Sequence, residues 1–322
     1  MRHGFTFSAA MGGLMLAALA APAFAADAKT TTVVDDRGVT VTVPAKAERV
    51  AGVSYFAADL AFALGLKPVA TTYMVAGRNP DYLLGLTKDI KQIGQRAKPN
   101  LELLSEAKPD LIVAIRRYTE GDAAQFQKIA PYVAYNMELL TESYKEVDQL
   151  SALMGKPERG KELNAAFRQH MAEYAQKAPK GKHPSFLITF GGDDPFAFHT
   201  ENTAAAIVAA LGGNNVAGPM AKGGRFGINL SLEDILAKDP DIIFVIDYYP
   251  DRPQENNPIW KQLSAVKNHR VYYVGDEWAE TNGPIAREMV LREAAHYLYP
   301  DTFPAVDVRA EAAKFIPAEL RK

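Results

Sequence analysis

Arginine side chains follow several apolar segments of this 322-residue chain, at the points where a strand would end and a loop begin. Arg116 and Arg117 directly follow one such segment, and Arg78 lies in the loop after another. Arg225 belongs to a glycine-rich loop, and Arg96 is a weaker candidate in a comparable position. Each planar guanidinium can form paired hydrogen bonds with carboxylate-like oxygens. If these residues converge on one cleft, the chemistry that they indicate is the capture of an anionic ligand.

Arg116 and Arg117 are neighbours, and adjacent residues of an extended chain point to opposite sides. One of the two is therefore expected to enter the cleft, and we favour Arg117. The alternative is that both form surface ion pairs with Glu120 or Asp122. For Arg225, the alternative is an ordinary solvated charge on a flexible loop.

Aromatic residues follow strand-like segments in the second half of the chain. His199, Tyr248, Tyr249 and Trp278 hold such positions, and so does Glu280. These side chains could form the wall of a pocket and pack against the organic frame of a ligand. The alternative for each aromatic residue is a place in the core, and for His199 it is a structural hydrogen bond.

The sequence lacks the usual motifs of catalytic and metal-binding sites. It has no G-x-S-x-G elbow, no Walker loop, no HxH or HExxH spacing and no cysteine. We therefore assign no catalytic residue and no metal ligand, and we expect a protein that is not an enzyme. A hydrolase that uses His199 with Asp193 or Asp194 is the alternative. The formal net charge is -2 and the basic residues are scattered, so no nucleic-acid partner is expected.

An internal repeat indicates how the chain positions these residues. Segment 100–118 aligns without a gap on segment 231–249, as NLELLSEAKPDLIVAIRRY on SLEDILAKDPDIIFVIDYY. Each copy opens on a helix N-cap residue, Asn100 or Ser231, and continues into an apolar run typical of a strand buried in a parallel sheet. Such sheets bind ligands beyond the carboxyl ends of their strands. Two copies predict two similar lobes with the ligand between them.

The fold class that we expect is α/β, with two similar lobes of mainly parallel sheet joined by a single long helix. Residues 1–25 have the charged start, the apolar run and the small residues of a signal peptide, with cleavage after Ala25. The remaining boundaries are an N-terminal α/β lobe at 26–140, a linking helical segment at 141–180 and a C-terminal α/β lobe at 181–322. The part of the linker that starts at Pro157 would form a helix of roughly 30 Å, long enough to cross between lobes.

Five segments of the chain carry a family resemblance: VVDDRGVTVTVPAKAERV, IGQRAKPNLELLSEAKPDLIVA, RRYTEGDAAQFQKIAPYV, LEDILAKDPDIIFVID and NPIWKQLSAVKNHRVYYV. With these segments the chain resembles the periplasmic solute-binding proteins that serve importers of ferric siderophores, haem and vitamin B12. The resemblance extends over nearly the whole chain after the leader, and within this class it is strongest to the ferric-dicitrate type of siderophore binder. Arg117 before Ile129-Ala130-Pro131 and the stretch Phe198-His199-Thr200 carry that closer likeness.

The resemblance implies a periplasmic receptor, monomeric and without an intrinsic cofactor, that carries a ferric chelate to a permease dimer in the inner membrane. It also implies that Glu102 and Glu233, which hold equivalent positions in the two repeat copies, dock onto that permease. One departure concerns the segment 278–282, which carries the acid Glu280 where binders of strongly anionic iron complexes tend to have basic residues. The departure puts citrate in doubt. A haem or cobalamin receptor is the alternative within the class, and it would need a flatter, more aromatic cleft with fewer arginines.

Overall fold

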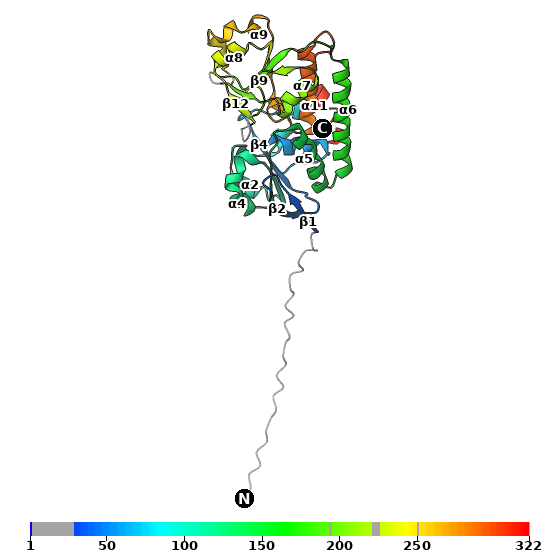
Figure 1. The fold of residues 1–322 in the computed structure, drawn as a ribbon. Coiled ribbons are helices and arrows are strands. Elements are labelled where there is room, and N and C mark those ends of the chain that lie inside the picture. The colour runs from blue at the N-terminus through cyan, green and yellow to red at the C-terminus, as the bar shows by residue number, and fades with distance from the viewer. Residues whose placement is uncertain (2–28, 193–194, 221–225, 250, 322) are drawn as a thin grey trace.

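The computed structural model describes residue 1 and residues 29–192, 195–220, 226–249 and 251–321 (Figure 1). The predicted signal peptide, Arg225 and the pair Asp193 and Asp194 therefore lie outside the described residues. The described chain begins with an antiparallel hairpin, as its alternating sequence predicts. Its strands are β1 (Thr30–Val34) and β2 (Thr40–Pro44).

The first lobe is built on a six-stranded sheet with the order β6-β5-β4-β3-β7-β8. All neighbouring strands are parallel except the edge pair β5 and β6. The strands are β3 (Val50–Val53), β4 (Ala70–Tyr73), β5 (Lys91–Gln95), β6 (Lys98–Pro99), β7 (Leu111–Ile115) and β8 (Tyr132–Tyr135). The helices between them are α1 (Tyr55–Ala63), α2 (Leu101–Glu106), α3 (Arg116–Thr119) and α4 (Ala123–Gln127).

The second lobe has a sheet with the order β12-β10-β9-β13-β14, and β11 also pairs with β9. Strands β9, β11, β13 and β14 pair in parallel, whereas β10 and β12 form an antiparallel edge. The strands are β9 (Ser185–Thr189), β10 (Phe196–Phe198), β11 (Asn214–Asn215), β12 (Gly227–Asn229), β13 (Ile242–Ile246) and β14 (Val271–Val274). The helices are α7 (Thr203–Ala210), α8 (Leu232–Lys238), α9 (Ser264–Lys267) and α10 (Asp276–Ala279).

The two repeat copies form equivalent helix and strand pairs, α2 with β7 and α8 with β13. Both N-caps are made: Asn100 Oδ1 accepts the amide of residue 103 at 2.9 Å, and Ser231 Oγ accepts that of residue 234 at 3.0 Å. The repeated aspartates also act alike. Asp110 accepts the backbone N–H of Arg49 at 3.0 Å and Asp241 accepts that of Ser185 at 2.7 Å, so each fixes the start of the strand beside it.

Two helices of the linking segment connect the lobes, α5 (Leu140–Leu153) and α6 (Pro157–Lys177). Figure 1 shows α6 running along one side of the molecule past both lobes. Its 21 residues agree with the helix predicted from Pro157. Within the described part of the chain, no helix has both the length and the apolar character required to cross a membrane.

The C-terminal segment does not stay within the second lobe. The first part of α11 (Pro284–Leu298) places Ile285 and Met289 in the core of the first lobe, while its last turns pack in the second. After α12 (Val308–Ala312) the chain adds Ile316 to the first core as well. The range 181–322 therefore contains residues of both lobes, because α11 crosses the boundary that the sequence pattern placed at the linker alone.

Candidate functional site

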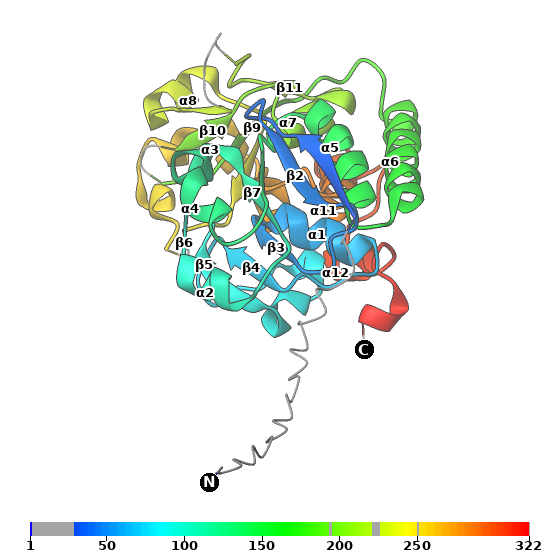
Figure 2. The same cartoon turned by 90° about the horizontal axis from the view of Figure 1, so that it is seen from below.

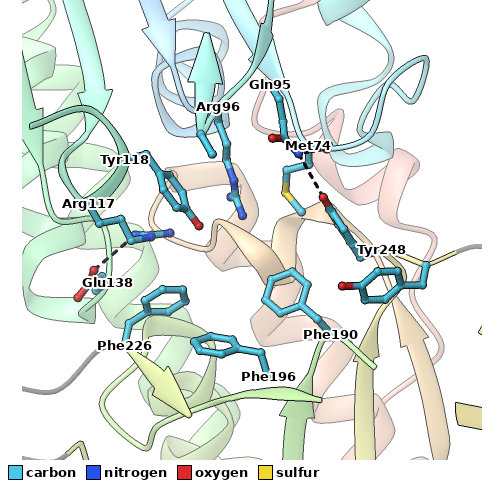
Figure 3. Close-up of a pocket in the computed structure, with 12 residues that line it drawn as sticks. Met74, Gln95, Arg96, Arg117, Tyr118, Glu138, Phe190, Phe196, Phe226 and Tyr248 are labelled. Atoms are coloured by element: carbon cyan, nitrogen blue, oxygen red, sulfur yellow. Dashed lines mark hydrogen bonds and ion pairs between the residues drawn. The ribbon is translucent and has the colours of Figure 1, made fainter. Parts of the chain in front are cut away.

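A pocket of about 800 Å³ lies between the two lobes, at the carboxyl ends of their parallel strands (Figure 3). This is the position expected for a ligand site in open parallel sheets, and the volume lies within the usual range for ligand pockets. The first lobe contributes Met74, Gln95, Arg96, Ala97, Arg117, Tyr118 and Glu138. The second lobe contributes Phe190, Phe196, Phe226, Tyr248 and Tyr249.

Arg117 is the cation that the first lobe directs into the pocket. It lies in α3, immediately after β7, and its Nη1 donates to the carbonyl oxygen of Asn136 at 3.2 Å. The same nitrogen lies 3.5 Å from the Glu138 carboxylate, and the guanidinium carbon lies 4.2 Å from the ring centre of Phe226. Burial lowers the pKa of Arg117, and its Nε has no hydrogen-bond partner within the described structure. Part of its donor capacity is thus unused.

Glu138 opposes Arg117 at the same edge of the pocket. Burial raises the pKa of Glu138, and the neighbouring Arg117 lowers it. The backbone of Glu138 is fixed independently of its side chain, since its carbonyl oxygen accepts the N–H of Thr203 at 2.8 Å and the Thr203 hydroxyl at 2.9 Å. The carboxylate is therefore presented to Arg117 by a rigid backbone.

Arg96 lines the pocket but is already neutralised from behind. It is buried and forms an ion pair with Glu280 of the second lobe. Burial lowers the pKa of Arg96, but Glu280 and Tyr118 together raise it, and the net direction is upward. Glu280 also accepts the backbone N–H of Tyr55 at 2.6 Å. Glu280 thus compensates the charge of a pocket arginine.

The second lobe presents an aromatic wall, defined here as the pocket-lining residues Phe190, Phe196, Phe226, Tyr248 and Tyr249. Figure 3 shows the three phenylalanines and Tyr248 opposite the arginines. Its rings contact one another, with centroids 5.1 Å apart for Phe196 and Phe226 and 6.0 Å apart for Phe190 and Tyr248. The Tyr248 hydroxyl accepts a hydrogen bond from Gln95 across the pocket at 3.2 Å. This wall can pack on aromatic or apolar parts of a ligand.

The structure separates Arg117 from Arg116, although not by strand alternation. Both residues begin the short helix α3, and only Arg117 lines the pocket. Arg116 is bound outside it, to Glu120 at 2.9 Å and to the carbonyl oxygen of Asp36 at 2.7 Å. The surface ion pair considered as an alternative for both arginines therefore forms for Arg116.

Arg78 and Trp278 do not line the pocket. Arg78 crosses the lobe interface elsewhere, where it donates to the Asp276 carboxylate and to the carbonyl oxygen of Asp247. Trp278 is fully buried, stacks on Phe244 at 4.7 Å and donates its Nε1 hydrogen to Glu293 at 2.9 Å. The expectation that these two side chains face the ligand is corrected. Arg78 forms hydrogen bonds across the interface between the lobes, and Trp278 lies in the core of the second lobe.

His199 and Arg225 are the remaining candidates. His199 is buried, does not line the pocket, and its Nδ1 has no partner among the described residues. Arg225 lies outside the described residues, directly before the pocket residue Phe226. Within the described chain, no cluster of three or more His, Asp or Glu side chains is arranged to hold a metal ion.

Sequence reasoning missed Glu138 and most of the aromatic wall. Phe190 follows β9 and Glu138 follows β8, so the rule that singled out Arg117 and Tyr248 could have found both. Phe196 lies in β10 and Phe226 directly precedes β12, and the short strand β12 has too few residues for a clear strand pattern.

A model of the periplasmic binding protein family matches residues 50–277. The Fe(3+)-citrate-binding protein YfmC of Bacillus subtilis (strain 168) is 26% identical over 284 residues, covering 85% of this chain and 88% of that protein. The Fe(3+) dicitrate-binding periplasmic protein FecB of Escherichia coli (strain K12) is 31% identical over 211 residues, covering 63% of this chain and 68% of that protein.

A solved structure of similar fold is that of Staphylococcus aureus SirA complexed with staphyloferrin B. Its TM-score is 0.68 at 26% identity, with 84% of this chain and 98% of that chain covered. The family match extends over most of the chain and includes both copies of the repeat and every residue that lines the pocket. This chain is a member of the periplasmic binding protein family.

Proposed function

We propose that this protein is the solute-binding component of an importer and that it captures a ferric chelate in the pocket between its lobes. The observation that carries the proposal is the placement of Arg117, with unused donor capacity, opposite the aromatic wall. Arg117 would bind an anionic oxygen of the chelate while the wall packs on its organic frame. The relatives named for ferric citrate and the neighbour solved with staphyloferrin B support an iron complex as cargo.

Haem is the second candidate ligand, and the aromatic wall favours it. Six aromatic residues, Tyr118 and the five of the aromatic wall, line the pocket beside only two arginines in its described part, and Arg96 is already paired. A flat macrocycle could lie on the wall with a propionate directed to Arg117. A hydrolase receives less support, because His199 is buried away from the pocket and its proposed partners Asp193 and Asp194 lie outside the described residues.

Calorimetric titration of the purified protein tests the proposal. The panel contains ferric citrate, ferric hydroxamate and catecholate complexes, haem and cobalamin. We expect at least one ferric complex to bind with a dissociation constant of about 1 μM or tighter, a free energy near -8 kcal/mol. Mass spectrometry of each recovered ligand should show no turnover. Binding of cobalamin alone, or conversion of any ligand to product, would contradict the proposal.

The proposal includes export to the periplasm as a monomer, with the leader removed after Ala25. The relative FecB is named as a periplasmic protein, which supports this location. Protein recovered from the periplasm should begin at Ala26, as N-terminal sequencing would show. A mature protein that retains residues 1–25 would argue for a membrane-anchored form.

Delivery to a permease dimer is also part of the proposal, with Glu102 and Glu233 as the docking residues. Both side chains are exposed, and neither forms an ion pair with another described residue. They hold the same position in the first turn of α2 and of α8. Figures 1 and 2 both place α2 and α8 on the side of the molecule opposite α6, one in each lobe. Two equivalent acids on one side would suit two equivalent permease subunits.

A further inference from the structure

We propose that the pocket selects a ferric complex of small net charge that has an aromatic face and an anionic edge, and that Glu138 is the residue that sets this selection. The inference rests on the proposed function, because it narrows the chemistry of the ligand in the same pocket. Citrate complexes, which are multiply charged and have no aromatic ring, fall outside this class.

The charges around the described pocket cancel. Arg96 and Arg117 supply two guanidinium groups, while Glu280 and Glu138 supply two carboxylates that pair with them one to one. The two pairs differ in accessibility. Arg96 and Glu280 are both buried, with 10% and 4% of their side chains exposed, whereas Arg117 and Glu138 retain 18% and 23%. Only the second pair can rearrange toward a ligand at little cost, so the residues that the structure describes around the pocket offer a place for about one negative charge.

The longer contact also indicates that Arg117 is available. The distance of 3.5 Å between its Nη1 and Glu138 exceeds that of a good charged hydrogen bond, and its Nη2 forms no hydrogen bond with a described residue. An anionic ligand group can therefore occupy a donor that Glu138 does not. Further charges on the same ligand would meet the Glu138 carboxylate, which repels them.

The aromatic wall also disfavours a ligand that carries several negative charges. Phe190, Phe196 and Phe226 are each partly buried and turn toward the pocket in Figure 3. Carboxylates placed against these rings would lose water without gaining a hydrogen bond, which disfavours a ligand that is charged on every side. An aromatic ring would instead stack on the wall. One side of the ligand is thus selected for charge and the other for apolar surface.

Four ferric probes separate charge from aromaticity in a calorimetric test. A bis-catecholate complex is aromatic and singly charged, and a tris-catecholate is aromatic and triply charged. A cyclic trihydroxamate is neutral and has no aromatic ring, and ferric citrate is multiply charged and has none. Haem is the fifth probe. It tests whether the aromatic surface that the pocket binds belongs to a macrocycle or to a siderophore. We expect the wild-type protein to bind the bis-catecholate or haem at least about tenfold more tightly than ferric citrate.

The variant Glu138→Gln removes the charge while the backbone contacts to Thr203 can remain. We expect it to strengthen binding of ferric citrate and the tris-catecholate by about tenfold and to change binding of the neutral trihydroxamate by less than about twofold. Glu120→Gln is the matched control, since Glu120 pairs with Arg116 outside the pocket. Phe196→Ala should weaken only the aromatic probes. Circular dichroism on each variant verifies folding, and Glu138→Ala serves as a second variant if Glu138→Gln fails to fold.

The outcomes separate this inference from the proposed function. The inference would be overturned if the wild-type protein bound ferric citrate most tightly, or if Glu138→Gln left the order of affinities unchanged. Either result would still agree with the proposed function as a receptor for ferric chelates. Binding of no iron complex would overturn both. A preference for aromatic, weakly charged complexes that shifts toward polyanions in Glu138→Gln would support the inference.

Discussion

Arg116 and Arg117 illustrate how adjacent residues of one type acquire different roles. Arg116 donates hydrogen bonds to the Glu120 carboxylate and to the backbone oxygen of Asp36, so its charge is compensated at the surface. Arg117 makes one hydrogen bond to a backbone oxygen and a long contact to Glu138, and its Nε lacks a partner in the described structure. The difference makes Arg116 a natural control for Arg117.

We predict that Arg117→Ala weakens binding of the cognate ferric complex by about tenfold or more, because a hydrogen bond to a charged group contributes roughly 1.5–3 kcal/mol. Arg116→Ala should change the affinity by less than about twofold. Titration calorimetry on both variants measures the difference. Equal effects of the two substitutions would remove Arg117 from the binding site.

Buried acids should make the protein more stable in mildly acidic solution than at neutral pH. Burial raises the pKa of Asp59 to about 7, and it also raises the pKa values of Glu146, Glu277 and Glu293. Between the unfolded and the folded pKa, the folded state binds more protons, so stability falls as the pH rises. Each such group steepens this slope by up to about 1.4 kcal/mol per pH unit.

We expect the free energy of unfolding to be larger at pH 5.5 than at pH 7.5, as urea titrations would show. Glu293→Gln should flatten the slope, since its amide oxygen can still accept the hydrogen bond from Trp278. Glu319→Gln, at an exposed position, should leave the slope unchanged. A free energy that rises with pH over this range would contradict the prediction.

At the scale of elements, the sequence predicts the regular parts well. The apolar runs of β7 and β13, the N-caps Asn100 and Ser231, and the helix from Pro157 all have strong local signals, and the structure contains each of them. The antiparallel edge of β10 and β12 has three residues in each strand; the strand-like segment before His199 indicates β10, but β12 and the pairing of the two strands have no such signal. Because that edge carries Phe196 and adjoins Phe226, the positions of these two of the five wall residues could not be predicted.

The repeat helices also allow a test of docking. We predict that Glu102→Arg combined with Glu233→Arg changes ligand affinity by less than about twofold, yet sharply reduces ATP hydrolysis by the reconstituted importer, because surface charges guide association. Glu158→Arg with Glu162→Arg reverses two exposed charges on α6, on the opposite side of the molecule, and is the matched control. If the first double variant stimulates ATP hydrolysis by the importer normally, Glu102 and Glu233 would have no docking role, and only their favourable interaction with the helix dipoles would remain.

At the scale of the whole molecule, the two lobes are less independent than the repeat suggests. Asp59 of the first lobe accepts the backbone N–H groups of Ile285 and Ala286, both at 2.8 Å, at the start of α11. Arg78 and Arg96 add ion pairs across the interface. Periodicity can indicate that a segment such as α11 is helical, but it does not reveal which lobe each turn of the helix contacts. The sequence thus predicts the two lobes, but it does not predict the contacts that join them.

The path of α11 and the residues after it has a mechanical consequence. The described chain starts in the hairpin of β1 and ends beyond Ile316, and both ends pack into the core of the first lobe. A force applied between residues 29 and 321 would therefore load the first lobe directly and leave the second slack. Because the chain has no cysteine, single thiols can be introduced as handles at chosen positions. In optical tweezers the first rupture should release the first lobe, at roughly 3.3–3.6 Å of contour per residue, and only then should tension reach β9 to β14.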